Sequence, residues 1–322
     1  MKKLIATITT FLAITLPSAV SAHVKWFAEP VVPVDPYQLT DGPVIIWIIA
    51  ALAVIGLGVL LEKKLPCPKW VTHQVPKFAP QALSLASIGF GAALIIFSIY
   101  GFVFAPNLPA TSSLLLITQL TAGILIFLGF YERLGAFLVL VLFVLGVHVY
   151  GAYEMIDTLE MIGFSFYVLI VGRPKWKLRE SKFLKKLIHP FHMYGVPILR
   201  IGTGVNLLVL GFTEKILAPS LTQEFLTHHD WNFMQKLGFE GFTDYWFAFS
   251  AGTTEALIGI FLILGLVTRV TTIVLAIFLL ITLYLLGPIE LIGHLPHFSI
   301  AIVLLVFGAG ARLKLLRHKK KC

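Results

Sequence analysis

The sequence predicts an all-α membrane protein, a polytopic helical bundle in which one N-terminal transmembrane helix precedes two parallel four-helix repeats. Three observations favour this class: the composition, the recurrence of long apolar runs and an internal duplication. Hydrophobic residues make up 58% of the 322 residues and charged residues only 13%, whereas a soluble domain carries about 25% charged residues. The apolar runs have roughly the 17 to 25 residues that cross a bilayer core of about 30 Å. We therefore expect most of the surface of this chain to contact membrane lipid.

The N-terminus has the pattern of an export signal. A pair of lysines precedes a short apolar run, which ends in the small residues that signal peptidase requires, with Ala22 last. We expect residues 1–22 to be a cleaved signal peptide; an uncleaved signal anchor is the alternative. Cleavage after Ala22 makes His23 the first residue of the mature protein. Residues 23–42 are rich in proline and are expected to form an extended periplasmic arm.

The chain contains nine candidate transmembrane spans. They cover roughly residues 43–61, 82–104, 114–130, 134–150, 158–172, 196–217, 247–266, 270–287 and 297–311. Lysine and arginine concentrate in alternate connecting segments, above all in a linker at 173–195 and a tail at 312–322, whereas acids gather on the other side. This asymmetry is the positive-inside pattern. We therefore predict a protein of the bacterial inner (cytoplasmic) membrane, with a periplasmic mature N-terminus and a cytoplasmic C-terminus.

The net charge of +9 does not call for a nucleic-acid partner. The basic segments lie next to predicted spans, where anionic lipid attracts them. The sequence also has no P-loop and no GxGxxG between a strand and a helix. Nucleic-acid binding and nucleotide binding are therefore excluded as leading functions.

Two ungapped alignments of the chain with itself indicate a duplication. A shift of 113 residues aligns Gly91 with Gly204, and a shift of 136 residues aligns Gly123 with Gly259. We therefore divide the bundle into a first unit, 82–172, and a second unit, 196–311. Each unit has an even number of spans, so the two repeats are parallel rather than inverted. The matching glycines are expected to let neighbouring helices pack closely.

The two predicted units differ in charge. Gly101, Phe102, Gln119, Thr158 and Met161 of the first correspond to Glu214, Lys215, Glu255, His294 and His297 of the second. The first unit is therefore largely apolar or neutral where the second is ionisable. Charged side chains at membrane depth cost a few kcal/mol and usually mark a function or a tight pair. We expect a functional site near the periplasmic surface of the second unit and a scaffold role for the first.

Four segments of the second unit carry a family resemblance. Residues 199–202, 211–215, 255–259 and 264–269 read Leu-Arg-Ile-Gly, Gly-Phe-Thr-Glu-Lys, Glu-Ala-Leu-Ile-Gly and Leu-Gly-Leu-Val-Thr-Arg. They resemble the DoxX/DoxD family of four-helix membrane proteins, and a weaker resemblance over 82–172 makes the chain similar to two tandem DoxX-like units. The family takes its name from a membrane subunit associated with thiosulfate:quinone oxidoreduction. The resemblance implies a four-helix bundle and an association with redox chemistry or quinones.

Five ionisable residues are predicted to meet at the periplasmic end of the second unit, where facing helices build buried sites. They are Glu214, Lys215, Glu255, Glu290 and His294. Lys215 can bind an anion or a quinone carbonyl while Glu255 or His294 transfers a proton, and Glu214 is a further catalytic candidate. In the alternative interpretation, Lys215 and Glu255 only neutralise each other, because an unpaired charge in lipid is costly.

The segment from 222 to 247 is rich in aromatic residues. It is expected to form a surface helix that caps the bundle. The alternative is a lid over a lipid-soluble ligand such as a quinone, with Lys215, Trp246 and Glu290 as cofactor-binding residues.

Histidines offer a candidate metal site. A mature N-terminal His23 presents its amine and its ring nitrogen, a pair suited to Cu(II). His294 and His297 are spaced to share a helix face and are further candidate ligands. Packing and surface roles are the alternative, because Pro296 separates these two histidines and no tight multi-ligand spacing occurs.

Three functions follow from these patterns. The leading hypothesis is a membrane subunit of a redox or respiratory system, with a quinone or proton-coupled ligand and a protein partner subunit. The second is a periplasmic copper-binding or assembly protein that uses His23. The third is a small-molecule transporter: the parallel repeat fits it, but broken helices with charges at mid-membrane are not evident.

Overall fold

The structure is a computed structural model that describes residues 34–64, 71, 73–172, 186–287 and 289–316. The predicted signal peptide, most of the arm with His23, most of the basic linker and the end of the tail lie outside these residues. Within them, every regular element is helical, and the one exception to helix and loop is an isolated bridge between Phe102 and Pro109. The all-α class is therefore confirmed.

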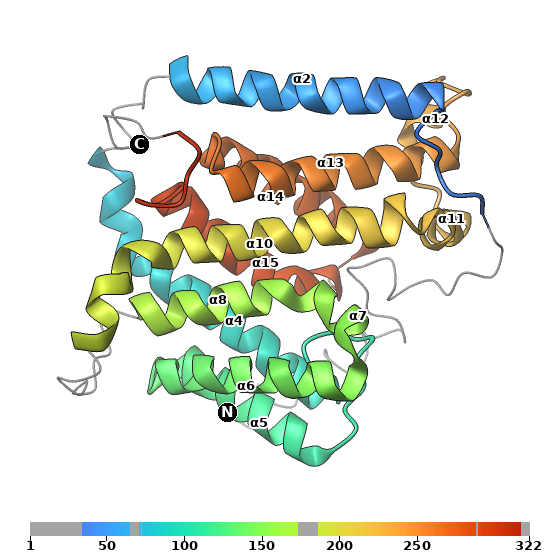
Figure 1. The fold of residues 1–322 in the computed structure, drawn as a ribbon. Helices are drawn as coiled ribbons and strands as arrows, with labels where there is room; N and C mark the ends of the chain where they lie inside the picture. The colour runs from blue at the N-terminus through green and yellow to red at the C-terminus, as the bar shows by residue number, and fades with distance from the viewer. Residues whose placement is uncertain (1–33, 65–70, 72, 173–185, 288, 317–322) are drawn as a thin grey trace.

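The elements follow one another along the chain with short connections. They are α2 (Gly42–Lys64), η2 (Val75–Phe78), α4 (Ala79–Ile99), α5 (Ser113–Leu128), α6 (Glu132–Tyr150), α7 (Ala152–Met155), η3 (Ile156–Thr158), α8 (Leu159–Val171), η4 (His189–Tyr194), α10 (Gly195–Leu210), η5 (Gly211–Ile216), α11 (Pro219–His228), α12 (Phe233–Lys236), α13 (Asp244–Leu264), α14 (Thr268–Leu286) and α15 (Ile289–Phe307). The end of the bundle where α7 and α11 lie (Figure 1) is called the α11 end below.

Five helical stretches of the described chain are long and apolar enough to cross a membrane. They are α2, α4, α6, α13 and the stretch Lys186–Ile216, which contains α10. Three further apolar helices, in α5, α14 and α15, are shorter. Membrane-spanning helices satisfy their backbone hydrogen bonds internally and expose apolar side chains to lipid. The chain is thus a multi-pass membrane protein, and the number of nine crossings stays a prediction.

The eight bundle helices pack in a closed ring. In chain order α4, α5, α6, α8, α10, α13, α14 and α15 each contact the next, and α15 returns to pack along α4. Helix α2 lies outside this ring at one edge of the molecule, where it contacts α13 (Figure 1). Its inner attachment is polar, because the Val267 backbone N–H donates to Glu62 Oε2 at 2.7 Å.

Two pairs of glycines set the closest helix contacts. Between α4 and α5, a Cβ added to Gly91 would lie 2.8 Å from the carbonyl oxygen of Gly123. Between α10 and α13, a Cβ added to Gly204 would lie 2.7 Å from the carbonyl oxygen of Gly259. Only glycine permits such approach of two backbones in a membrane bundle. The same contact therefore occurs at the two positions that the sequence alignment matches.

The turns after α5 and α13 also share one geometry. Gly129 and Gly265 end these helices in the left-handed region, with φ of 74° and 69°. Two residues later Tyr131 and Val267 also have positive φ, 50° and 34°. Positive φ is uncommon for a bulky residue, so its recurrence at matched positions marks two similarly built turns.

Three local expectations require correction. Helix α15 begins at Ile289 and continues through Pro296, so His294 lies in a helix and not in an outer loop; membrane helices tolerate an internal proline because neighbouring helices satisfy the freed backbone group. Helix α13 begins at Asp244, which puts Glu255 about three turns into it rather than two. The aromatic segment forms two short helices, α11 and α12, instead of one.

Candidate functional site

The candidate site is built on a π-helical turn, η5, that continues α10 at the α11 end. A Cβ added to Gly211, its first residue, would lie 2.6 Å from the carbonyl oxygen of Gly252 on α13. This close approach brings Glu214 and Lys215 against α13. π-helical turns carry an extra residue per turn and occur often at functional sites.

Lys215 and Glu255 form an ion pair inside the bundle. Lys215 Nζ donates to Glu255 Oε2 at 2.7 Å, and the two side chains are only 12% and 13% exposed. The lysine stem packs on α13, because its Cβ lies 2.8 Å from the position of a Cβ on Gly252. Removing two charges from water is costly, and only a well-formed pair offsets this cost. The predicted pairing of these two residues is therefore present.

Two more carboxylates act on the same lysine. Glu214 is fully buried, and its carbonyl oxygen accepts a hydrogen bond from Thr222 Oγ1 at 3.1 Å, which ties α11 to η5. Asp157, also fully buried, belongs to the turn η3 before α8. The charges of both Glu214 and Asp157 reach Lys215. One buried cation thus faces three carboxylates.

Three residues of this region were missed by sequence reasoning: Asp157, Glu160 and Asn206. Their residues are 0%, 3% and 0% exposed. The expectation that the first unit lacks ionisable groups is therefore wrong, since Asp157 and Glu160 belong to it. An acidic residue inside the predicted span 158–172 was the signal that could have found Glu160.

His294 and His297 are buried on α15, at 5% and 2% exposure, with ring centroids 5.9 Å apart. The backbone of Glu290 lies at the start of the same helix, and its side chain is outside what the structure describes. Among the described residues, no group of three or more His, Cys, Asp or Glu side chains is arranged to hold a metal ion. His23 lies outside the described residues, so the copper hypothesis stays a prediction.

Trp246 lies in an aromatic cluster that holds the arm rather than at the ion pair. Tyr37 of the arm contacts the rings of Tyr245, Trp246 and Phe249, and its hydroxyl donates to the Tyr245 carbonyl oxygen at 2.6 Å. Burial raises the pKa of Tyr37 above its usual range. Trp246 precedes Glu255 by nine positions on α13, about 13 Å along the helix axis. The end of the arm is thus docked on the N-terminus of α13.

The position that corresponds to Glu255 in the first unit is occupied by Gln119, which is fully buried. Its Oε1 accepts from the Phe104 backbone N–H at 2.9 Å, and its Nε2 donates to the Phe102 carbonyl oxygen at 2.9 Å and to Ser98 Oγ at 3.1 Å. These bonds satisfy the irregular backbone that follows α4. A neutral amide therefore joins the two elements in the first unit where an ion pair joins them in the second.

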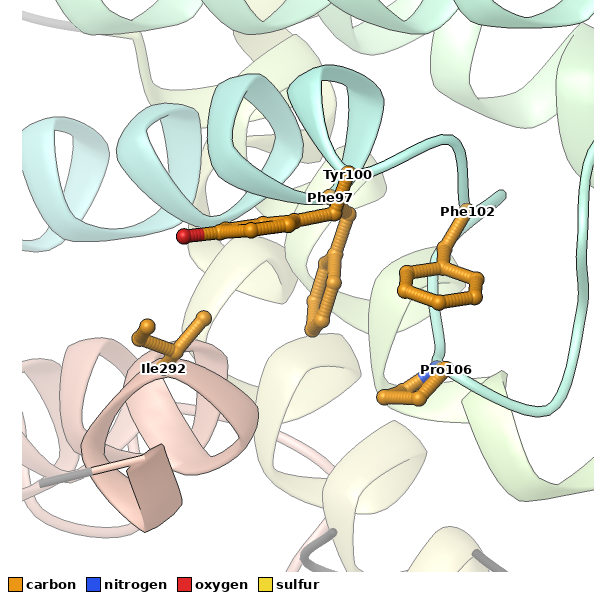
Figure 2. Close-up of a pocket in the computed structure, with 5 residues that line it drawn as sticks. All are labelled: Phe97, Tyr100, Phe102, Pro106 and Ile292. Atoms are coloured by element: carbon orange, nitrogen blue, oxygen red, sulfur yellow. The ribbon is translucent and has the colours of Figure 1, made fainter. Parts of the chain in front are cut away.

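A small hollow lies beside the end of α4. It is lined by Phe97, Tyr100, Phe102, Pro106 and Ile292, whose side chains come from α4, the following loop and α15 (Figure 2). All five lining residues are apolar or aromatic. The hollow therefore offers apolar contact surface, while the ionisable chemistry lies at η5, α8 and α13.

Apolar spans, a ring of packed helices and a buried ion pair define a multi-pass helical membrane protein with an ionisable centre. The model of the DoxX family matches residues 195–288. The chain therefore contains a DoxX family domain, which includes Glu214, Lys215 and Glu255 and ends before His294. Comparisons with curated proteins and with solved structures gave no match.

Proposed function

We propose that this protein is the membrane subunit of a redox system and binds a quinone-class ligand at the Lys215–Glu255 pair. The single observation that carries the proposal is the buried 2.7 Å ion pair on a π-helical turn, with two more carboxylates acting on its lysine. Ionisable groups at membrane depth are costly and are found mainly where substrates or protons move. The family domain in this segment supports a redox association.

The chemistry of a quinone fits this set of groups. Reduction of a quinone to a quinol takes up two electrons and two protons, one proton on each oxygen. Lys215 donates a hydrogen bond to a quinone carbonyl and stabilises the negative charge that develops there on reduction. Glu214, Glu255 and Asp157 act as proton carriers by general acid catalysis. The electrons come from a soluble partner subunit, which the proposal requires.

A purely structural pair explains less of the site. One carboxylate is enough to neutralise Lys215, and each further buried carboxylate adds a desolvation cost of several kcal/mol. Glu214 and Asp157 both act on the lysine in addition to Glu255. An excess of acids around one cation favours a site where a proton is gained and released.

The proposed architecture places the site in the second of two parallel four-helix units. The matched close contacts at Gly91–Gly123 and Gly204–Gly259 and the matched turns after Gly129 support a duplication. The ring order supports it further, because the last helix of each unit packs on the first helix of the other. The charge asymmetry of the sequence supports an inner-membrane location with the α11 end on the periplasmic side.

Quinone binding by the purified full-length protein in lipid nanodiscs tests the proposal. The double variant Lys215→Met/Glu255→Gln removes both charges together, so neither is left unpaired. We expect a ubiquinone or menaquinone analogue to bind this variant at least about tenfold more weakly than the wild type, a difference of about 1.4 kcal/mol. Unchanged affinity in the double variant would overturn the proposal.

Two further variants control this experiment. Lys236→Met/Asp230→Asn removes an exposed ion pair of 3.0 Å whose side chains are 54% and 86% exposed, and it should bind the analogue as the wild type does. The swapped variant Lys215→Glu/Glu255→Lys keeps a pair but moves the ammonium group, and we expect binding to stay weak. Full binding by the swapped variant would mean that the pair is only structural.

A further inference from the structure

A second polar centre lies between α8 and α10, the two helices that join the halves of the ring. These helices are antiparallel, since α7 leads into α8 and α10 leads toward α11 at the same end of the bundle (Figure 1). Their closest contact is between glycines: a Cβ on Gly202 would lie 2.8 Å from the Cα of Gly163. This contact sets the register of the two helices.

One turn from the glycine contact, toward the α11 end, Glu160 and Asn206 occupy the same seam. Glu160 precedes Gly163 by three positions and Asn206 follows Gly202 by four, so in antiparallel helices both are one turn away in the same direction. Asn206 Oδ1 accepts a hydrogen bond from the backbone N–H of Leu159 at 3.2 Å. This bond directs the amide of Asn206 at the first turn of α8, beside Glu160.

Each of the two side chains has one buried polar atom without a hydrogen-bond partner in the described chain. In Glu160 this atom is Oε2, and in Asn206 it is the donor Nδ2. A buried polar atom without a partner costs about 1–3 kcal/mol, and most native proteins avoid it. Two such atoms on one seam, one a donor and the other a carboxyl oxygen, indicate a site that is retained for a function.

We infer that Glu160 and Asn206 form a proton-binding site between α8 and α10, separate from the Lys215–Glu255 pair. Glu160 holds the proton as a neutral carboxylic acid, and it releases the proton to leave a carboxylate that the Asn206 amide orients. The proton is the only species gained or lost, so the step needs no oxidant or reductant. The inference does not depend on quinone binding.

The charged and titratable groups around Glu160 favour proton exchange on one side. Asp157, three residues earlier, acts electrostatically on Glu160 and also on Lys215. It therefore lies between the seam and the ion pair and connects them for proton transfer. Helix α15 contributes His294 and His297, both buried at the same end of the bundle.

The remaining ionisable groups of the packed helices are at the opposite end. Arg200 of α10 donates to the carbonyl oxygens of Leu262 and Ile263 at the end of α13. Glu132 and Arg133 of α6 lie beside Gly172, just after the end of α8. None of these three groups neutralises Glu160, and exchange is thus directed toward the α11 end.

The equivalent seam on the other side of the ring is an internal comparison. Helices α4 and α15 meet where a Cβ on Gly89 would contact Ser299 Oγ, and these positions align with Gly202 and Gly163. The residues that correspond to Asn206 and Glu160 there are Ala93 and Pro296, both buried. Helix packing alone is therefore achieved without a polar pair at this position, which supports a functional reason for Glu160 and Asn206.

Infrared spectroscopy of the purified full-length protein in lipid nanodiscs tests the inference. A neutral buried carboxylic acid gives a carbonyl band separate from those of carboxylates and amides, and the band shifts to lower frequency in D2O because its proton exchanges. We expect this band at neutral pH in the wild type and its loss in Glu160→Gln. Glu240→Gln, which changes an exposed residue of the outer segment, should keep the band.

A second variant separates the site from a fold defect. Asn206→Leu should keep the band but shift its frequency, because the carboxyl group loses its amide neighbour. A band that persists unchanged in Glu160→Gln, or a wild type without any such band, would overturn the inference. Retention of the Glu160 band in a protein that binds no quinone would contradict only the proposed function, and quinone binding without the band would contradict only the proton site.

Discussion

The identity of one side chain decides how each half of the bundle closes at the end of its first helix. Gln119 joins α5 to the irregular segment after α4 through neutral hydrogen bonds, and every partner atom is satisfied locally. Glu255 joins α13 to η5 through a charge, which requires Lys215. A neutral amide is the cheaper solution in lipid, so retention of the ion pair marks the second half as the chemically active one.

The surplus of acids predicts unequal effects of removing either partner of the pair. Lys215→Met leaves Glu255, Glu214 and Asp157 without their shared cation, and we expect it to lower the free energy of unfolding by about 3–5 kcal/mol. Glu255→Gln leaves Lys215 with two other acids, and we expect a loss of about 1–2 kcal/mol. Thermal unfolding in nanodiscs measures the difference. Equal effects would mean that Glu214 and Asp157 do not stabilise the lysine.

Helix packing depends on backbone contacts at a few glycines. The α4–α5 and α10–α13 pairs meet through glycines on both sides, and the α8–α10 seam does the same at Gly163 and Gly202. Each contact fixes a register, and the register in turn determines which polar residues face each other one turn away. The position of Asn206 opposite the start of α8 is a result of this kind.

The glycine contacts predict a contrast between helices. A Cβ at Gly91 would lie 2.6 Å from the Phe127 backbone nitrogen and one at Gly204 would lie 2.7 Å from the Gly259 carbonyl oxygen. Replacement of either by Ala must separate two helices, and we expect a cost of about 1–3 kcal/mol in thermal unfolding.

Gly56→Ala in α2 is the matched control for this contrast. Nothing lies within 4 Å of a Cβ at Gly56, and alanine is favoured over glycine in a helix interior by about 0.5–1 kcal/mol. The control should therefore be neutral or slightly stabilising. A destabilisation equal to that of the buried glycines would show that the effect does not arise from helix contacts.

At the scale of the whole molecule, the ring is held together by two seams between its halves, α4–α15 and α8–α10. Both seams join helices that are far apart in the sequence or separated by the basic linker. The linker is therefore not needed to bring the halves together once both are in the membrane.

The ring predicts that the protein can be divided within its linker. Residues 1–180 and 181–322, expressed together as separate chains, should assemble and be purified together through a tag on either half. Gly202→Leu in the second half should reduce their association, because it separates α8 from α10. Purification of each half alone under the same conditions would contradict the importance of the seams.

Much of this architecture could be predicted from the sequence, because apolar length and charge asymmetry act locally. The pairing of Lys215 with Glu255 was also accessible, since two opposite charges in lipid require each other. The π-helical turn was not, because it depends on the contact between Gly211 and Gly252. The role of Glu160 was missed because its partner, Asn206, is set by the register of two helices and not by its neighbours in the chain.

The closed ring has the geometry of a twofold dimer whose two copies share one chain. In a dimer of identical subunits, every residue at one seam is repeated at the other. A polar site at the contact would then always occur twice, with both of its desolvation costs. One covalent chain removes this constraint, so Glu160 and Asn206 can occupy one seam while Pro296 and Ala93 keep the other apolar. The fusion of two halves thus allows a symmetric scaffold to carry a single, directional path for protons.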